Sequence, residues 1–167
     1  MTVVTGRRRI GKTSLIKKAF EDSDEPMLYF FTGRKAEAAL VDDFVREVHS
    51  TLHGYVPEGL KSVTGVLKHL FELAKTTKFT LVIDEFQEFM TVNPSVFSDL
   101  QNLWDSYRSC TRMNLVLSGS VMSMMRRIFT DAHEPLFGRV DNIINLRPFR
   151  IKVVQEGLKV YNPEYSN

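Results

Sequence analysis

Hydrophobic positions along the chain alternate between short continuous runs and longer periodic stretches. The short runs are rich in Val, Ile, Leu, Phe and Tyr, which favour β-strands, and three of them are continuous apolar runs typical of strands buried on both faces. Strands are expected over five segments: Thr2 to Thr5, Met27 to Thr32, Phe79 to Asp84, Asn114 to Ser118 and Asn142 to Leu146.

The stretches between these runs carry helical spacing. Apolar residues recur every four positions in one of them, at Leu40, Phe44, Val48 and Leu52. Helices are expected over Gly11 to Phe20, Ala36 to Leu52, Val63 to Ala74, Ser95 to Ser109 and Val121 to Phe129. Strands that alternate with helices predict an α/β fold of three layers, in which helices cover both faces of a parallel sheet.

A phosphate-binding motif follows the first expected strand. The letters GRRRIGKT match the pattern G-x-x-x-x-G-K-[ST], and a helix is expected directly afterwards. Such a loop binds phosphates mainly through backbone amides, so the three arginine side chains are expected to face solvent rather than to act in catalysis. Lys12 would reach the β- and γ-phosphates, and the Thr13 hydroxyl would bind Mg²⁺. The expected nucleotide-binding residues are Gly6, Arg7, Arg8, Arg9, Ile10, Gly11, Lys12, Thr13 and Ser14.

Two acids end the third expected strand. Asp84 is expected to hold Mg²⁺ together with Thr13, and Glu85 is placed to orient and deprotonate an attacking water. The alternative is that both acids only stabilise the start of a helix through its dipole. The phosphate loop upstream favours the magnesium and general-base roles.

Glu85 also narrows the class of phosphate-loop protein. A catalytic acid directly after the magnesium aspartate resembles the division in which an additional strand separates the two motif strands. The run from Asn114 to Ser118 is the candidate for that strand. Ser118 or Ser120 would then lie near the γ-phosphate, and Ser120 is our choice as a nucleotide contact. An ordinary helix N-cap remains an equal alternative for Ser120.

Arg139 is the candidate for an arginine that stabilises transition-state charge, either within the chain or from a neighbouring subunit. A structural salt bridge is the competing interpretation. Arg126, Arg127 and Arg147 are weaker candidates of the same kind.

Composition adds limits to this interpretation. The chain has 167 residues, a formal net charge of +2 and one cysteine, Cys110. The length suits one domain, the near-neutral charge does not favour nucleic acid, and a single cysteine fits a reducing compartment. No apolar run approaches the roughly 20 residues that span a bilayer. We therefore expect a cytoplasmic protein with no membrane partner. His49, His53, His69 and His133 form no zinc pattern with Cys110.

Four strings together resemble the prokaryotic archaeal-type ATPases, which belong to the AAA+-related STAND signalling ATPases: GRRRIGKTSLI, LVIDEFQEF, NLVLSGSVMSMM and PLFGRVDNIINLRPF. The resemblance implies a sheet ordered 5-1-4-3-2, ATP and Mg²⁺ as ligands, and switching controlled by nucleotide. It also implies an arginine-sensing role for Arg139. The residues themselves contain no motif that reads adenine rather than guanine.

The resemblance further implies a division of the chain. Residues 1–150 would form the ATPase core, and residues 151–167 would begin a C-terminal helical lid that this chain truncates. Members of the family continue into further domains, so a protein partner, a homo-oligomer, or DNA bound through those domains would be compatible with this core.

Three functions are therefore open. The first is a STAND-type ATPase that hydrolyses ATP slowly and acts as a conformational switch. The second is a DNA-associated AAA+ ATPase, similar to origin-recognition or transposition ATPases, which predicts salt-sensitive DNA binding. The third is a module that binds nucleotide without turnover, against which Glu85 argues.

Overall fold

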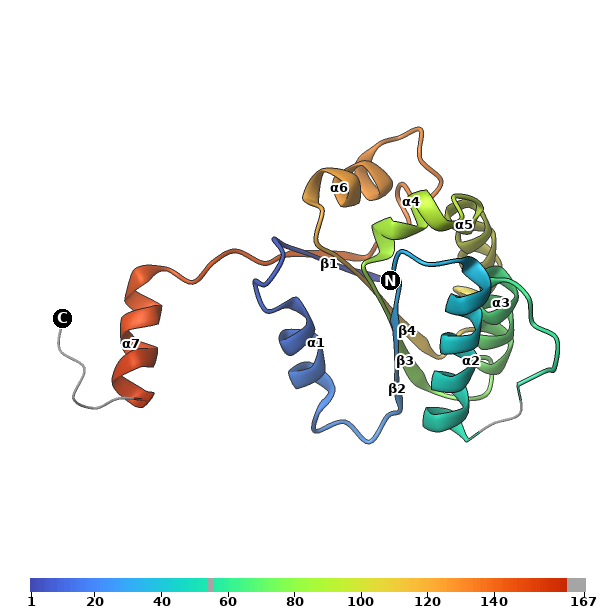
Figure 1. Cartoon of the computed structure of the whole chain (residues 1–167), viewed down its shortest axis with the longest axis horizontal. Coiled ribbons are helices and arrows are strands. Elements are labelled where there is room, and N and C mark those ends of the chain that lie inside the picture. The colour runs from blue at the N-terminus through green and yellow to red at the C-terminus, as the bar shows by residue number, and fades with distance from the viewer. Residues whose placement is uncertain (54–55, 162–167) are drawn as a thin grey trace.

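The computed structural model describes residues 1–53 and 56–161, and its centre is a parallel five-stranded sheet (Figure 1). The strands are β1 (Thr2–Thr5), β2 (Met27–Phe31), β3 (Phe79–Asp84), β4 (Met113–Gly119) and β5 (Asn142–Asn145). Their order is β2-β3-β4-β1-β5, with every neighbouring pair parallel. Read from the other edge this is 5-1-4-3-2, so the expected fold and the additional strand between β1 and β3 are confirmed.

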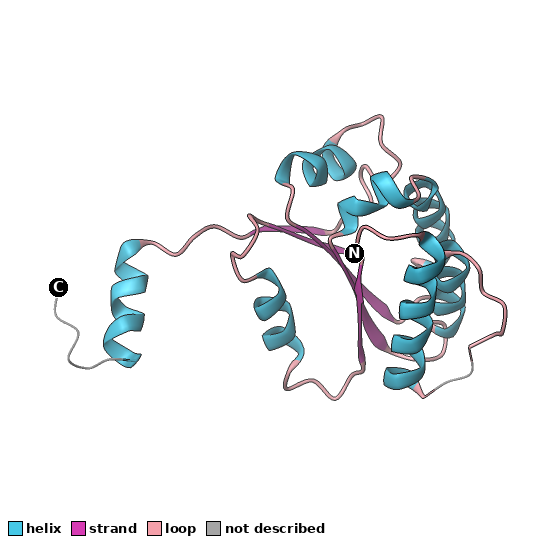
Figure 2. Cartoon of the chain, in the orientation of Figure 1, coloured by secondary structure: helices cyan, strands magenta, loops and turns pink. Residues whose placement is uncertain are grey.

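Helices cover the sheet unequally on its two faces (Figures 1 and 2). One face carries α1 (Lys12–Phe20), whose Ile16 packs on Val4, Val82 and Val116. On the other face lie four helices: α2 (Glu37–Leu52), α3 (Val63–Leu73), α5 (Ser95–Tyr107) and α6 (Met122–Thr130). Successive residues of a strand point to opposite faces of the sheet. One continuous apolar run therefore contributes side chains to the hydrophobic core on each face.

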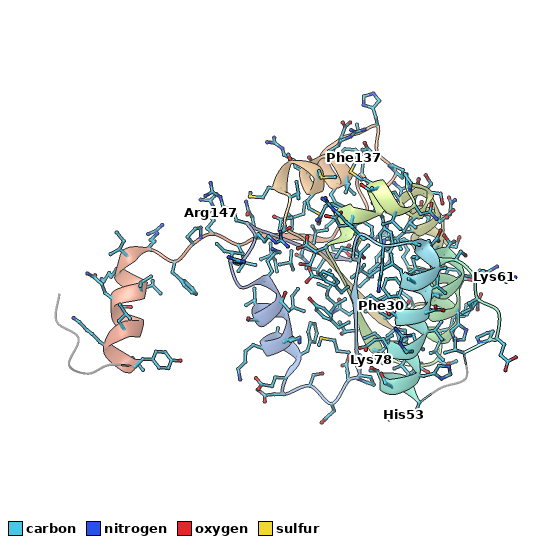
Figure 3. The ribbon with its side chains drawn as sticks, in the orientation of Figure 1. Phe30, His53, Lys61, Lys78, Phe137 and Arg147 are labelled. Atoms are coloured by element: carbon cyan, nitrogen blue, oxygen red, sulfur yellow. The ribbon has the colours of Figure 1, made fainter. Side chains whose placement is uncertain are left out.

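The larger core depends on aromatic packing between sheet and helices. All six residues of β3 are buried, as the continuous apolar run predicts. Phe30 of β2 points inward and stacks on Phe44 of α2 with ring centroids 4.1 Å apart (Figure 3). Phe97, Leu100 and Trp104 of α5 are buried in the same core. The four-residue spacing of α2 therefore marks the face that it buries.

Two short helices directly after β3 were not predicted. They are the 3₁₀ turn η1 (Phe86–Glu88) and α4 (Phe89–Val92). Glu85 precedes them with φ 53°, a left-handed conformation that turns the chain sharply at the end of the strand. Helices this short bury only a few residues, so no helical periodicity accumulates in the sequence.

The C-terminal helix α7 (Ile151–Tyr161) stands apart from the sheet, at the end of an extended connection (Figure 1). None of its side chains is buried, and all four residues of β5 are exposed as well. Residues 162–167, which belong to the expected start of a lid, lie outside the described residues.

Parallel pairing places the carboxyl ends of the strands at one edge of the sheet. Thr5 pairs with Gly119, and Phe31 pairs with Asp84. The phosphate motif after β1, the acids at the end of β3 and the segment after β4 therefore lie at the same edge. No helix among the described residues is long and apolar enough to cross a membrane.

We expect Phe44→Ala to lower the free energy of unfolding by about 3–5 kcal/mol, because it leaves a cavity beneath the Phe30 ring. The matched control is Phe31→Ala, which removes a ring that is 56% exposed and costs less than about 1 kcal/mol. Urea denaturation measures both variants. Equal losses would contradict the assignment of this core.

Candidate phosphate and magnesium site

The loop between β1 and α1 has the backbone geometry of a phosphate cradle. Arg9 and Gly11 adopt positive φ values of 64° and 97°, which bend the chain sharply before α1. Gly6 is constrained by space, because an added Cβ would lie 3.0 Å from the Ile10 side chain and from the Leu146 carbonyl oxygen. The structure therefore explains the two glycines of the motif by different causes, namely close packing at Gly6 and backbone conformation at Gly11.

The N-terminus of α1 lies directly behind this loop. No side chain caps it, so its first amides keep their donors directed out of the helix. Together with the positive end of the helix dipole, free amides suit an anion such as a phosphate group. The Arg7, Arg8 and Arg9 side chains are exposed, and Arg8 and Arg9 border the cleft in front of the helix.

Lys12 is almost wholly buried, with 6% of its surface exposed. Its Nζ donates to the carbonyl oxygens of Gly6 at 3.0 Å and Arg7 at 3.3 Å. In the described part of the chain no carboxylate forms an ion pair with it. Carbonyl dipoles hold the ammonium in place without neutralising its charge, which leaves it able to bind a phosphate.

Asp84 and Thr13 meet in front of the loop. The Thr13 hydroxyl donates to Asp84 Oδ2 at 3.3 Å, and Asp84 Oδ1 accepts from the amide of Glu85 at 3.0 Å. A hydroxyl beside a carboxylate is the hard oxygen pair that Mg²⁺ takes from a protein in phosphate-loop sites. These residues, with the sharp bend at Arg9 and Gly11, fit a magnesium–nucleotide complex.

Tyr29 of β2 joins the same group and was missed by the sequence reasoning. Its hydroxyl donates to Asp84 Oδ2 and lies 3.4 Å from Thr13 Oγ1. Burial and the hydrogen bond to Asp84 raise the pKa of the phenol well above its usual range. The strand pattern shows only that Tyr29 alternates with the inward-facing Leu28 and Phe30, so its contact with Asp84 had no sequence signal.

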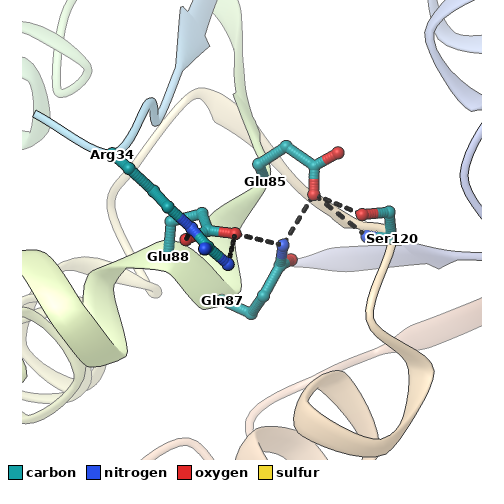
Figure 4. Close-up of polar contacts among 5 residues, drawn as sticks. All are labelled: Arg34, Glu85, Gln87, Glu88 and Ser120. Atoms are coloured by element: carbon teal, nitrogen blue, oxygen red, sulfur yellow. Dashed lines mark hydrogen bonds and ion pairs between the residues drawn. The ribbon is translucent and has the colours of Figure 1, made fainter.

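The carboxylate of Glu85 points toward the end of β4 (Figure 4). Its Oε2 accepts from the Ser120 hydroxyl at 2.7 Å, from the Ser120 amide at 3.3 Å and from Gln87 Nε2 at 2.6 Å. The structure thus brings Ser120 to the expected edge, where its hydroxyl contacts Glu85. Ser118, the other candidate serine, is fully buried, and its hydroxyl has no hydrogen-bond partner among the described residues.

The phosphate loop and the two acids line a cleft of about 290 Å³. Its walls are Arg8, Arg9, Gly11, Lys12, Thr13, Ser14, Asp84 and Glu85. A larger groove of about 820 Å³ lies elsewhere, between α6 and the strands β1 and β5, and is lined mostly by apolar atoms. The smaller cleft is the candidate functional site, because it holds the phosphate loop and both acids.

Arg139 lies away from this cleft. It precedes β5, and β5 starts beside the first residue of β1, so Arg139 belongs to the edge of the sheet opposite the phosphate loop. Its guanidinium binds both carboxylate oxygens of Asp105 at 2.7–3.1 Å and the Phe137 carbonyl at 2.9 Å. The salt bridge of the competing interpretation is therefore present, and a role in hydrolysis would require a neighbouring subunit.

The weaker arginine candidates divide in the same way. Arg127 pairs with Glu134 at 2.6 Å, and Arg126 borders the larger groove on α6. Arg147 is exposed and follows Leu146, whose amide donates to the Thr5 carbonyl oxygen at 2.7 Å (Figure 3). Of these three, only Arg147 lies at the edge that carries the phosphate loop.

The topology, the loop and the two acids define a P-loop nucleoside-triphosphatase fold of the additional-strand type. The profile of a family described as "ATPase domain predominantly from Archaea" matches residues 1–164. The chain belongs to this family of ATPase domains.

Two curated relatives come from Methanocaldococcus jannaschii. The uncharacterized protein MJECL04 is 28% identical over 154 residues, which covers 92% of this chain and 32% of that protein. The uncharacterized protein MJ0424 is 30% identical over 78 residues, which covers 46% of this chain and 76% of that protein. The chain thus spans about a third of MJECL04.

Solved structures show the same fold at low identity. The Walker-type ATPase PABY2304 of Pyrococcus abyssi aligns with a TM-score of 0.73 and 20% identity, over 98% of this chain and 53% of that one. Cdc6p from Pyrobaculum aerophilum aligns with a TM-score of 0.63 and 18% identity, over 94% of this chain and 41% of that one. The ORC2 protein of Aeropyrum pernix was solved as ADPNP–ADP complexes. It aligns with a TM-score of 0.66 and 12% identity, over 99% of this chain and 47% of that one.

Tyr29 generates a prediction about alkaline stability. Because its pKa is raised in the fold, the unfolded chain loses this proton first, and stability falls as pH rises above about 10. Tyr29→Phe should make the fall shallower when urea unfolding is followed from pH 8 to 11. Tyr161→Phe, in a residue that is 91% exposed on α7, is the control and should leave the slope unchanged. Equal slopes for wild type and Tyr29→Phe would refute the prediction.

Proposed function

We propose that the chain binds ATP with Mg²⁺, hydrolyses it slowly and uses the bound nucleotide as a conformational switch. The observation that carries the proposal is the convergence of Lys12, Thr13, Asp84 and Glu85 on one cleft at the carboxyl edge of the sheet. These residues come from two segments that are separated by about 70 positions in the sequence and belong to strands that are not neighbours.

Each residue has a distinct part in this proposal. The loop amides and Lys12 bind the phosphates, while Thr13 and Asp84 hold Mg²⁺, which neutralises phosphate charge when bound. Glu85 accepts the proton of the attacking water. We choose ATP over GTP because the family is one of ATPases and the ORC2 structure, similar in fold, contains adenine nucleotides.

The switch part of the proposal concerns α7. An amphipathic helix with no buried side chain, joined to the sheet by the segment after β5, is suited to change its position with little loss of packing. In this proposal residues 151–167 begin a lid whose orientation depends on the γ-phosphate, in the manner of a STAND ATPase. The unpaired Cys110 supports a cytoplasmic setting.

A DNA-associated ATPase is the second candidate. It is favoured by the exposed arginines Arg7, Arg8, Arg9, Arg147 and Arg150, which gather in the segments after β1 and β5. Strongly salt-dependent DNA binding, lost when these arginines are replaced, would support this candidate over a switch that acts only on protein partners.

Glu85→Gln should keep ATP binding and lower kcat by about 10²-fold or more, because the amide cannot take a proton. Lys12→Ala should instead weaken ATP binding by about tenfold or more, because a charged hydrogen-bond donor is lost. Equilibrium binding of ATP and GTP with Mg²⁺, together with phosphate release, measures both effects. Turnover that survives Glu85→Gln would show that the assigned base is wrong, while wild-type binding without turnover would favour the module that only holds nucleotide.

Arg139 is proposed to act on the nucleotide of a neighbouring subunit. If so, Arg139→Ala lowers kcat by about 10³-fold or more in an assembly, with ATP affinity unchanged. Mixing Arg139→Ala with Lys12→Ala should then restore part of the activity, because one mixed interface has an intact loop and an intact arginine. If the mixture is as inactive as each variant alone, Arg139 does not act across an interface, and its role is only the structural ion pair with Asp105.

A further inference from the structure

We infer that Gln87, to which the sequence analysis assigned no role, is a positioning residue for the general base: it holds one oxygen of Glu85 so that the other oxygen faces the phosphate cleft. This inference rests on the proposed function, since it assigns a part in the same hydrolysis. Gln87 lies in η1, two residues after Glu85.

All the donors to Glu85 converge on the same atom. Gln87 Nε2, the Ser120 hydroxyl and the Ser120 amide reach Oε2 at 2.6, 2.7 and 3.3 Å (Figure 4). Among the described residues no donor reaches Oε1. A carboxylate held through one oxygen cannot rotate freely, and its second oxygen keeps the lone pairs that a water proton needs.

The direction of this hold matters for hydrolysis. Ser120 follows β4, and β4 lies between β3 and β1 in the sheet. A Glu85 side chain drawn toward β4 is therefore drawn toward the strand that carries the phosphate loop. The cleft walls include Glu85 together with Lys12 and Thr13, in agreement with that direction.

Burying the Gln87 amide lowers the stability of the fold, which a residue with only a structural role would avoid. Its side chain is buried, with 1% of its surface exposed, and its Oε1 has no donor in the described part of the chain. Phe86 and Phe89, its neighbours in the sequence, are fully buried and meet at 79° with ring centroids 5.7 Å apart. An apolar side chain of the same size would avoid the cost of an unpaired carbonyl, so the benefit of the amide must lie at its other end, on Glu85.

The sheet leaves room for this amide at Gly119. A Cβ there would lie 2.4 Å from Gln87 Oε1 and 2.3 Å from Met125 Sδ. Any side chain at this position would therefore displace the amide from Glu85. The glycine at the end of β4 and the glutamine in η1 depend on each other.

The Gln87 amide has a second, longer contact, with Glu88. Gln87 Nε2 lies 3.4 Å from Glu88 Oε1, and Glu88 pairs with Arg34 at 2.7 Å (Figure 4). Arg34 offsets the negative charge of Glu88, so the Gln87 amide is not the main partner of that second carboxylate. The short contact at 2.6 Å remains with Glu85.

The decisive variant is Gln87→Met, which keeps the volume and removes the donor. We expect kcat for ATP to fall about tenfold or more, KM and ATP affinity to stay within about twofold, and thermal stability to hold or rise. The matched control is Thr32→Val, directly after β2, which removes a fully buried hydroxyl that has no hydrogen-bond partner among the described residues. It should leave kcat unchanged. Gly119→Ala should reproduce the loss of kcat with Gln87 still present.

A double variant separates this inference from the proposed function. In a Glu85→Gln background, Gln87→Met should cause no further loss of kcat, because the residue acts only through Glu85. If Glu85→Gln abolishes turnover but Gln87→Met leaves kcat unchanged or raises it, the positioning role is wrong while the proposed base stands. If Glu85→Gln itself retains full turnover, the proposed role of Glu85 as the base is wrong, and the inference about Gln87 is wrong with it. A lower melting temperature in proportion to the lost activity would mark Gln87 as purely structural.

Discussion

Parallel pairing of β4 between β1 and β3 is the constraint on which the site depends. Because parallel strands end at one edge, the loop after β1, the acids after β3 and the serine after β4 lie together, although they are far apart in the sequence. The inserted strand also places β1 and β3 two strand spacings apart, about 9.6 Å, instead of one. In the proposed function, the phosphates of a nucleotide, their metal and an attacking water occupy that space between Lys12 and Glu85.

The two acids at this edge are held by specific hydrogen-bond partners. Thr13 and Tyr29 donate to Asp84, and Gln87 and Ser120 donate to Glu85. The two acids are adjacent in sequence, yet the left-handed backbone at Glu85 sends their side chains to different partners. In the proposed function one carboxylate holds the magnesium ion and the other acts on the water. Strain at such a position persists only where the surrounding contacts determine it, as they do at functional sites.

Solved structures of similar fold extend beyond the region that aligns with this chain. PABY2304, Cdc6p and ORC2 align over nearly all of this chain, while the chain covers only 41–53% of theirs. The exposed surfaces of β5 and α7, and the apolar groove beside α6, lie outside the phosphate cleft.

The sequence alone determined the elements that obey simple periodicity and local chemistry. The apolar run of β3 and the spacing of Leu40, Phe44 and Val48 follow from burial, and the glycines around Lys12 follow from the shape of a phosphate loop. Only the tertiary structure decided the positions of Tyr29, Gln87 and Arg139. Their roles depend on contacts across strands and helices: Tyr29 with Asp84, Gln87 with Glu85 and Gly119, and Arg139 with Asp105. Such contacts leave no period in a sequence, because they are set by how the sheet brings distant strand ends together.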